Sequence, residues 1–270
     1  MNYVLIDMSY FIFYRYYALI AWWKLAKPED NLDIPFENTE FVGKFKKTFI
    51  DKINEIPKKL KIKNIMYICA RDCNRKNIWR MSNNITYKAN RENDDRFLGG
   101  PFFKLAYEIL QEINMPILFH DKLEGDDCIA LLIKDIRSKY ENIKKDYNIY
   151  IIASDMDYLQ LVSENTHIIN LKYKNLTDSK KWSGDPKKDL FCKIVMGDVS
   201  DNIPGIFKKC GIKTAIKYYE DEDLFKKKLH QENAEELFKK NKRLIDFQEI
   251  PQDLIDDYRV KNKDIISMIV

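Results

Sequence analysis

Acidic residues crowd the segment LEGDDCIALLIKD, which covers residues 123–135. Glu124, Asp126 and Asp127 lie within four positions and lead directly into an apolar run that is typical of a buried helix. At an effective dielectric constant near 20, two carboxylates about 5 Å apart repel each other by roughly 3 kcal/mol. Such a group is stable only if its members are protonated or bind cations, and hard oxygen ligands suit magnesium or manganese.

The elements that must position these carboxylates are short apolar runs that alternate with helical patterns. The apolar runs, which we interpret as buried strands, cover 3–6, 64–70, 115–119, 148–153 and 166–171. The helical patterns lie near 9–25, 38–59, 101–114, 126–140 and 185–196. Strands separated by helices predict an α/β fold with a mostly parallel central sheet and helices on both faces.

Further acidic residues recur where the predicted strands end. Asp7 follows the first run, Asp72 follows the second, and Glu124 comes shortly after the third. Asp155 and Asp157 follow the fourth run. Because ligands of open parallel sheets bind at the carboxyl ends of the strands, these segments would deliver their carboxylates to one edge of the sheet.

The segment MGDVSDNIPG completes the candidate metal site with two acidic residues three positions apart. The predicted metal-binding residues are Asp7, Asp72, Glu124, Asp126, Asp127, Asp155, Asp157, Asp198 and Asp201. So many carboxylates favour two ions, and two neighbouring metal ions are a common device for phosphodiester hydrolysis. Each pair taken alone has a simpler explanation, because acidic residues also favour helix N-termini, caps and turns.

Two basic segments accompany the acidic residues. The polar stretch 73–96 carries Arg80, Lys88 and Arg91, whose cations would contact a phosphate that bridges the ions, although a solvated loop explains them equally well. The segment 197–219 is expected to form two helices joined by a basic turn, where backbone amides hold a phosphate. An ordinary helix pair with a solvated basic face is the alternative.

Composition excludes several other classes of protein. The 270 residues suffice for one large domain or a domain with a smaller appendage. Five cysteines without a CxxC pair and only three histidines argue against a disulfide framework, a zinc site or histidine-based catalysis, and favour a reducing compartment. Asp7 and Arg15 break the apolar N-terminus into pieces too short to span a bilayer. We therefore expect an intracellular protein without a membrane partner.

Five motifs in this order resemble those of the flap endonuclease or 5′-nuclease family, which includes phage 5′-exonucleases and the 5′-nuclease domain of bacterial DNA polymerase I. The motifs are VLIDMSYFIFYRYYA, YKANR, EGDDCIA, ASDMDYLQL and GDVSDNIPG…GIKTA. The resemblance covers most of residues 1–220. It implies a structure-selective 5′-nuclease that hydrolyses phosphodiester bonds with two Mg²⁺ ions, which Mn²⁺ can replace.

The resemblance also implies a role for each matched residue. The ligands of the first ion would be Asp7, Asp72, Glu124 and Asp126. The ligands of the second ion would be Asp155, Asp157 and Asp201, with Asp127 and Asp198 acting through water. Arg80 and Lys88 would lie over the scissile phosphate. The predicted DNA-binding residues are Arg15, Arg91, Gly205, Lys208, Lys209, Gly211, Lys213 and Thr214.

The same resemblance implies a division of the chain. Residues 1–184 would form the nuclease core, with a short arch near 80–98 through which a single-stranded 5′ end passes. Residues 185–248 would form a helical subdomain whose helix–turn–helix module grips duplex DNA, and 249–270 a C-terminal segment. The family's module often holds K⁺, but Lys209 stands where a glycine is expected, which argues against K⁺ here.

The expected partner is DNA with a 5′ flap, a nick or a free 5′ end, including RNA-primed ends, and the expected state is a monomer. Two alternatives remain. A PIN-like endoribonuclease would share the sheet and some carboxylates, but it would not need GDVSDNIPG…GIKTA. A non-catalytic junction-binding protein of the same fold would be expected to have lost carboxylates that this chain retains.

Overall fold

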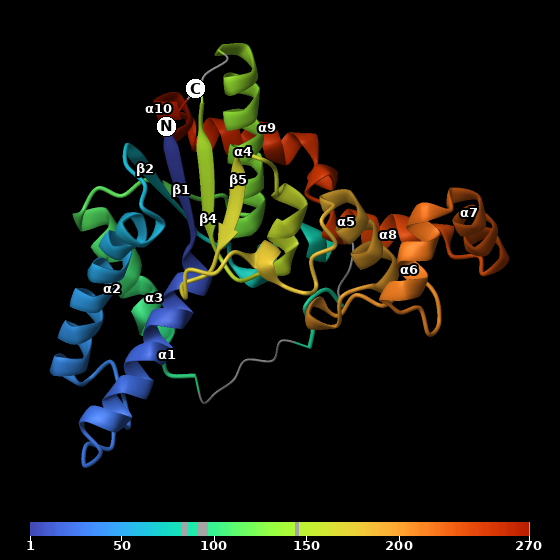
Figure 1. The fold of residues 1–270 in the computed structure, drawn as a ribbon. Helices are drawn as coiled ribbons and strands as arrows, with labels where there is room; N and C mark the ends of the chain where they lie inside the picture. The colour runs from blue at the N-terminus through green and yellow to red at the C-terminus, as the bar shows by residue number, and fades with distance from the viewer. Residues whose placement is uncertain (83–85, 91–96, 144–145, 270) are drawn as a thin grey trace.

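A five-stranded parallel sheet forms the centre of the molecule (Figure 1). The computed structural model describes residues 1–82, 86–90, 97–143 and 146–269. The strands are β1 (Asn2–Asp7), β2 (Ile65–Ala70), β3 (Ile117–Leu118), β4 (Asn148–Ile152) and β5 (Thr166–Ile169). Their order is β3-β2-β1-β4-β5, and every pairing is parallel, so the predicted sheet is confirmed.

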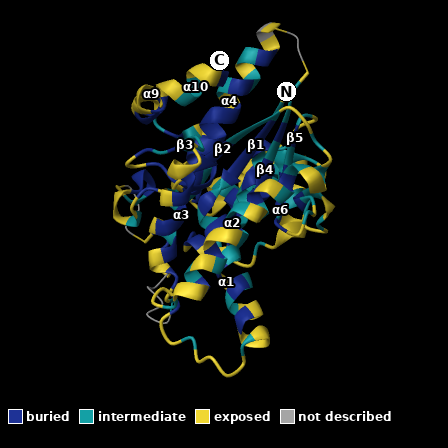
Figure 2. Ribbon diagram, turned by 90° about the vertical axis from the view of Figure 1, so that its left-hand side faces the viewer, coloured by how far each residue is buried: buried dark blue, intermediate teal, exposed yellow. Residues whose placement is uncertain are grey.

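Both faces of the sheet are covered, as predicted. Along β1, Tyr3 and Leu5 belong to one hydrophobic cluster, whereas Val4 and Ile6 belong to the other. This alternation follows from the two-residue period of a strand, and burial on both faces explains why the strand is apolar throughout. Figure 2 shows the buried sheet enclosed by helices whose outward surfaces are exposed.

The helices divide between the two faces. One face is covered by α1 (Met8–Ala26), α2 (Thr39–Leu60) and α3 (Gly100–Glu112). The other face is covered by α4 (Gly125–Ile143), α9 (Gln252–Lys261) and α10 (Lys263–Ile269). Residues at helical spacing on one side of α2, such as Phe41, Phe45 and Phe49, are fully buried. Within the described ranges, no helix is long and apolar enough to cross a membrane.

Four helices project from the side of the sheet (Figure 1). They are α5 (Pro186–Met196), α6 (Ile212–Glu220), α7 (Glu222–Gln231) and α8 (Glu235–Ile245). They share a hydrophobic cluster of their own, which includes Val195, Phe207 and Phe225. The change to helical structure after residue 185 was predicted correctly.

The prediction of two helices within 197–219 was wrong. Across 197–211, all of which is described, the chain forms one 3₁₀ turn and an irregular loop, and only α6 follows. The loop is irregular because Pro204 and two glycines interrupt any helical run. The helix pair that flanks the basic loop is therefore α5 and α6.

Short 3₁₀ helices complete the fold. They are η1 (Arg75–Asn77), η2 (Trp79–Ser82), η3 (Met156–Leu161), η4 (Leu176–Asp178), η5 (Val199–Asp201) and η6 (Phe247–Glu249). The C-terminal helices pack onto the loop that leads into α4. The Asn262 side chain pairs with both the backbone N–H and the carbonyl of Phe119, each at 3.1 Å, and the Tyr258 hydroxyl donates to the Cys128 carbonyl at 3.1 Å.

Candidate active site

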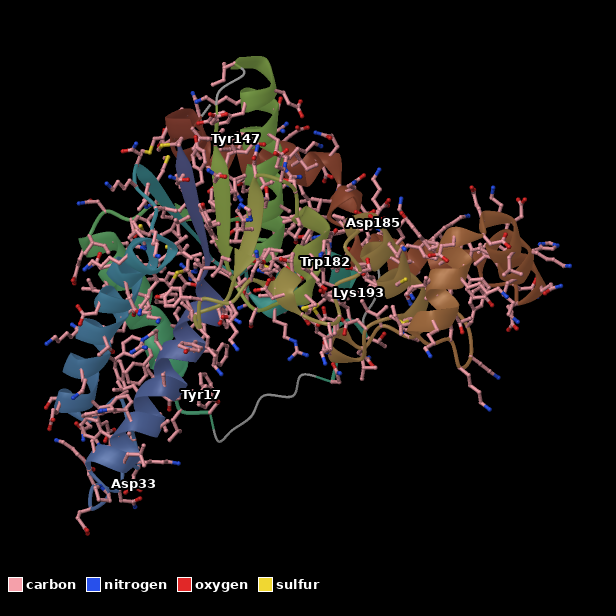
Figure 3. The ribbon with its side chains drawn as sticks, in the orientation of Figure 1. Tyr17, Asp33, Tyr147, Trp182, Asp185 and Lys193 are labelled. Atoms are coloured by element: carbon pink, nitrogen blue, oxygen red, sulfur yellow. The ribbon has the colours of Figure 1, made fainter. Side chains whose placement is uncertain are left out.

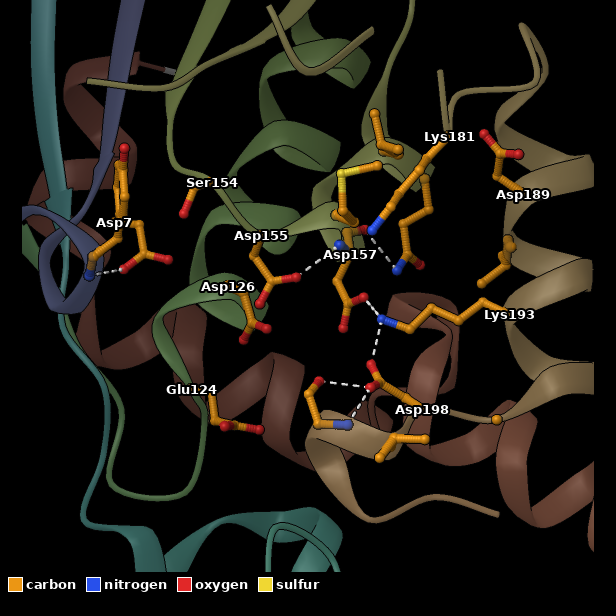
Figure 4. Close-up of a pocket in the computed structure, with 18 of the residues that line it drawn as sticks. Asp7, Glu124, Asp126, Ser154, Asp155, Asp157, Lys181, Asp189, Lys193 and Asp198 are labelled. Carbon is orange, nitrogen blue, oxygen red and sulfur yellow. Dashed lines mark hydrogen bonds and ion pairs between the residues drawn. The ribbon is translucent and has the colours of Figure 1, made fainter. Parts of the chain in front are cut away.

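A cavity of about 770 Å³ opens at the carboxyl ends of the central strands. The strand order reverses between β1 and β4, and ligands of open α/β sheets bind at such a switch point. The acidic residues that line the cavity are Asp7, Asp72, Glu124, Asp126, Asp155, Asp157, Asp189 and Asp198. Seven of the nine predicted metal-binding residues therefore line one cavity, and Figure 4 shows most of them facing it.

Asp7 is held by the junction of β1 with α1. Its Oδ1 caps α1 by accepting the Tyr10 backbone N–H at 3.0 Å, and its Oδ2 accepts the Tyr158 hydroxyl at 3.1 Å. The strand runs directly into the helix, so the carboxylate has little freedom. Burial, together with the neighbouring charge of Asp72, raises the pKa of Asp7 to about 7.

Asp72 follows β2 and is held by the start of α4. Gly125 donates its backbone N–H to Asp72 Oδ1 at 2.6 Å, and the Ser9 hydroxyl donates to Oδ2. A Cβ atom on Gly125 would lie 3.0 Å from Asp72 Oδ1, so this close approach favours glycine. Asp72 lines the cavity, yet protein atoms surround its carboxylate. Burial therefore raises its pKa.

Asp126 and Asp127 lie side by side in sequence but have different surroundings. Asp127 is fully buried and accepts two hydrogen bonds from Arg80, at 2.7 and 2.8 Å, and one from Trp79 Nε1 at 3.0 Å. Asp126 instead lines the cavity, and burial together with the charges of Asp127 and Glu124 raises its pKa well above the usual value. The expected role of Asp127 in metal binding through water stays a prediction.

Arg80 and Lys88 surround Glu124. Lys88 Nζ lies 2.5 Å from Glu124 Oε1, and Arg80 donates to Oε2 at 3.2 Å. Burial alone would raise the pKa of Glu124, but the charges of Lys88 and Arg80 outweigh it and hold the pKa below its usual value. Arg80 is 2% exposed and its Nε donates to the Leu244 carbonyl at 2.8 Å. Because Arg80 is so deeply buried, the structure does not support its predicted contact with a phosphate, which stays a prediction. Lys88, in contrast, lines the cavity, where a phosphate could reach it.

We call Asp7, Asp72, Glu124 and Asp126 the first acidic cluster, and Asp157, Asp198 and Asp201 the second acidic cluster. Each residue of the second acidic cluster offers one carboxylate oxygen, and these oxygens all lie within 4.8 Å of one another.

Two tight turns present the second acidic cluster. Asp155 caps η3 by accepting the Asp157 backbone N–H at 2.9 Å. Asp198 and Ile203 exchange backbone hydrogen bonds of 2.8 Å, which close the loop that carries Asp201. Gly197 begins this loop with φ +76°, a left-handed conformation that favours glycine.

Two residues that the sequence did not single out connect these carboxylates. The Tyr87 hydroxyl donates to Glu124 at 3.1 Å and to Asp201 at 3.3 Å, which links the two clusters. Lys193 Nζ contacts Asp157 and also lies 2.7 Å from Asp198. Burial would raise the pKa of Asp198, but the Lys193 charge and bonds from Ser200 lower it to about 2. Lys193 is one lysine among many in its segment, so no sequence signal marked it.

The predicted DNA-binding residues lie mostly beyond the cavity. Those exposed on the loop between α5 and α6 and on the first turn of α6 are Gly205, Lys208, Lys209, Gly211, Lys213 and Thr214. Lys209 has φ +57°, so the chain adopts there the left-handed conformation that would suit the expected glycine. Arg15 is half-buried on α1 and does not line the cavity, and Arg91 lies outside the described residues, as does much of the predicted arch near 80–98.

The donor set fits divalent metal ions. Carboxylate oxygens converge from separate segments, with a group around Glu124 and Asp126 and a second group around Asp157. Hard oxygen ligands of this kind suit Mg²⁺ or Mn²⁺, which neutralise the repulsion between neighbouring carboxylates.

Comparisons with known proteins identify the family. Residues 2–185 match the model of the 5′-3′ exonuclease N-terminal resolvase-like domain. A 5′-3′ exonuclease of Buchnera aphidicola is 31% identical over 223 residues, which span 79% of this chain and 68% of the relative. The DNA polymerase I of Treponema pallidum is 32% identical over 136 residues, which span 48% of this chain but only 13% of the polymerase.

Solved structures show the same fold. The D15 protein of bacteriophage T5, co-crystallised with metal ions, superposes with a TM-score of 0.70 at 18% identity, over 98% of this chain and 100% of that protein. A complex of the T5 D15 flap endonuclease with DNA and metal ions has a TM-score of 0.67 at 18% identity, over 99% of this chain and 100% of that protein. From the match over residues 2–185 and the relative covered over most of its length, this chain belongs to the 5′-3′ exonuclease family.

Proposed function

We propose that this protein is a magnesium-dependent, structure-selective 5′-nuclease that hydrolyses phosphodiester bonds near the 5′ ends of branched or nicked duplex DNA. The observation that carries the proposal is the convergence of the first acidic cluster with Asp155, Asp157 and Asp198 in one cavity at the switch point of the sheet. Membership of the 5′-3′ exonuclease family supports it, as does the similarity of the fold to that of the T5 D15 flap endonuclease in complex with DNA and metal ions.

The chain's own groups would hold the ions and place the substrate. Asp7, Asp72, Glu124 and Asp126 would hold the first ion, and the second acidic cluster with Asp155 the second. Bound ions would supply Lewis-acid chemistry, which lowers the pKa of an attacking water and neutralises charge on the phosphate. Lys88, which lines the cavity beside Glu124, would stabilise the developing negative charge.

Arg80 would act as a positioning residue. It is enclosed by protein, pairs with both Asp127 and Glu124, and is anchored to the Leu244 carbonyl. By fixing Asp127 it also fixes the first turn of α4, which presents Asp126 to the cavity. Its charge further offsets the repulsion among the neighbouring carboxylates.

We further propose that residues 1–184 form the nuclease core and that 185–248 grip the duplex. The exposed lysines before α6 and on its first turn, Lys208, Lys209 and Lys213, would contact the DNA backbone without reading base sequence. The N-terminus of α6 lies beside them and presents free backbone N–H groups, which favour a phosphate.

The direct test is cleavage of an end-labelled 5′-flap duplex by purified protein in Mg²⁺, in Mn²⁺ and in EDTA. We expect short 5′ products only with a divalent ion. Asp126→Asn should lower the cleavage rate by about a thousandfold, which corresponds to about 4 kcal/mol. The matched control is Asp33→Asn, because Asp33 is exposed at the far end of α1 from the cavity (Figure 3).

The same assay separates the two alternative functions. Cleavage of single-stranded RNA in preference to the flap would instead identify an endoribonuclease. Flap binding that persists in EDTA, without cleavage in either metal, would identify a non-catalytic junction-binding protein. Equal activity of the Asp126→Asn variant and wild-type protein would show that the cavity described above is not the active site.

A further inference from the structure

Lys193 lies inside the second acidic cluster. It belongs to α5, and its ammonium contacts Asp157 Oδ1 and lies 2.7 Å from Asp198 Oδ2. Figure 4 shows the side chain reaching from the helix to a point between these two carboxylates, and Figure 3 places it where the projecting helices meet the sheet. The ammonium therefore connects η3, which carries Asp157, with the loop after α5, which carries Asp198.

The position of this ammonium coincides with the space that a metal ion would need. The ligand oxygens of Asp157, Asp198 and Asp201 lie within 4.8 Å of one another, so a cation that binds all three must sit between them. Lys193 Nζ already bridges two of these three carboxylates. A dication and an ammonium at such short separation repel each other strongly, so both cannot occupy the site together.

Arg80, which pairs with Glu124 of the first acidic cluster, is placed differently. Arg80 is held by the Leu244 carbonyl and by Asp127, which lines no part of the cavity, so it can stay while an ion binds. Lys193 is on the cavity wall, its side chain is 23% exposed, and its long flexible stem can swing toward solvent.

We propose that Lys193 is a built-in competitor of the second metal ion: it neutralises the second acidic cluster in the metal-free protein and must leave before an ion binds there. The inference rests on the proposed two-ion function. Lys193 thereby weakens the second ion site relative to the first, so that the ions bind in order. The displaced ammonium stays at the cavity, where the phosphate of a substrate would attract it away from the carboxylates and thus favour the second ion.

The test is a calorimetric titration of Mn²⁺ into metal-free protein, with no nucleic acid present. In Lys193→Met we expect the more weakly bound Mn²⁺ ion to bind at least about tenfold more tightly than in the wild-type protein, because one positive charge has been removed from its site. The stronger ion should bind within about twofold of the wild-type value, because the groups around its site are unchanged. Without metal, the melting temperature of Lys193→Met should fall, since Asp157 and Asp198 lose the cation that pairs with them.

The matched control is Lys188→Met. Lys188 lies on the same helix with a side-chain exposure of 24%, close to the 23% of Lys193, but it pairs with Glu220 outside the cavity. This control should leave both affinities unchanged. Lys193→Gln, which keeps a polar side chain without the charge, serves as a second variant if the methionine variant folds poorly, and it should also tighten the weaker site.

If Lys193 only held the fold together, its replacement would not tighten the binding of the second ion. Weaker or unchanged binding of the second ion in both Lys193 variants would overturn the inference while leaving the proposed nuclease intact. If neither wild-type nor variant protein binds any Mn²⁺, the proposed function fails together with it.

Discussion

The two acidic clusters are neutralised in different ways. The first acidic cluster extends from the ends of β1 and β2 and the start of α4, and its charge is offset by Arg80, which is enclosed by protein, and by Lys88, which lines the cavity. The second acidic cluster lies on η3 and on the loop after α5, and partly exposed Lys193 offsets its charge from the cavity side. The first site is thus preformed by the sheet, whereas the second depends on how the helical segment is docked.

The largest expected effect is a loss of stability when Arg80, the buried cation beside the first acidic cluster, is removed. Arg80→Met should lower the free energy of unfolding by about 3–5 kcal/mol, because it leaves Asp127 buried without its partner. Urea denaturation followed by circular dichroism measures the loss. The double variant Arg80→Met/Asp127→Leu should recover much of it, since an apolar pair replaces the buried ion pair. A loss below about 1 kcal/mol for Arg80→Met would refute this contrast with Lys193.

The next effect is on the pH dependence of stability, where Asp7 of the first acidic cluster and Asp198 of the second should act with opposite sign. The pKa of Asp7 is raised to about 7. Its contribution to the stability of the folded state is therefore complete below the pKa that Asp7 has in the unfolded chain, and it is lost as pH rises through about 7. The lowered pKa of Asp198, about 2, means that its contribution is present at higher pH and is lost as pH falls through about 2. Metal-free protein should therefore lose stability, on the order of 2 kcal/mol, on either side of about pH 4, the ordinary pKa of an aspartate.

Thermal melts across the pH range in EDTA would measure this dependence. Millimolar Mg²⁺ should raise the melting temperature more at about pH 7.5 than at about pH 5.5, because the carboxylates must lose their protons to bind the ion. An equal rise at both pH values would argue against protonated carboxylates in the first acidic cluster.

A smaller effect is expected where the clusters are joined. Tyr87→Phe removes the hydroxyl that donates to Glu124 and Asp201 and should cost about 1 kcal/mol of stability. It should also alter the affinity of both ion sites in a Mn²⁺ titration. Tyr17→Phe, at a tyrosine that is 53% exposed on α1, is the control and should change neither quantity.

The smallest effect should appear at the basic loop, outside both clusters. Lys208→Gln and Lys213→Gln should each weaken flap binding severalfold and lower the slope of log affinity against log salt by about 1. Fluorescence anisotropy at several salt concentrations, in Ca²⁺ or EDTA, would measure both. Lys104→Gln, at an exposed lysine of α3, is the control. Unchanged salt dependence in the loop variants would place the duplex on another surface.

Most of the fold followed from local patterns. Each predicted apolar run overlaps a strand, and the helices near 9–25 and 38–59 appear as α1 and α2. Such elements are predictable because burial on both faces leaves a continuous apolar run, and burial on one face of a helix leaves a period of 3.6 residues. The first of the two helices expected within 197–219 is absent because residues 197–211 are stabilised by turns and a closed loop, which have no periodic signal.

Spacing along the chain was enough to predict that carboxylates follow four of the five strands, because acidic residues come after the first four apolar runs. The sequence by itself also carried the motifs that indicate the 5′-nuclease family. Only the tertiary structure decided that Asp127 pairs with Arg80 while Asp126 faces the cavity, and that Lys193 enters the second acidic cluster. The physical reason is that the charge state and role of a carboxylate depend on partners brought together by folding, and spacing along the chain does not encode those contacts.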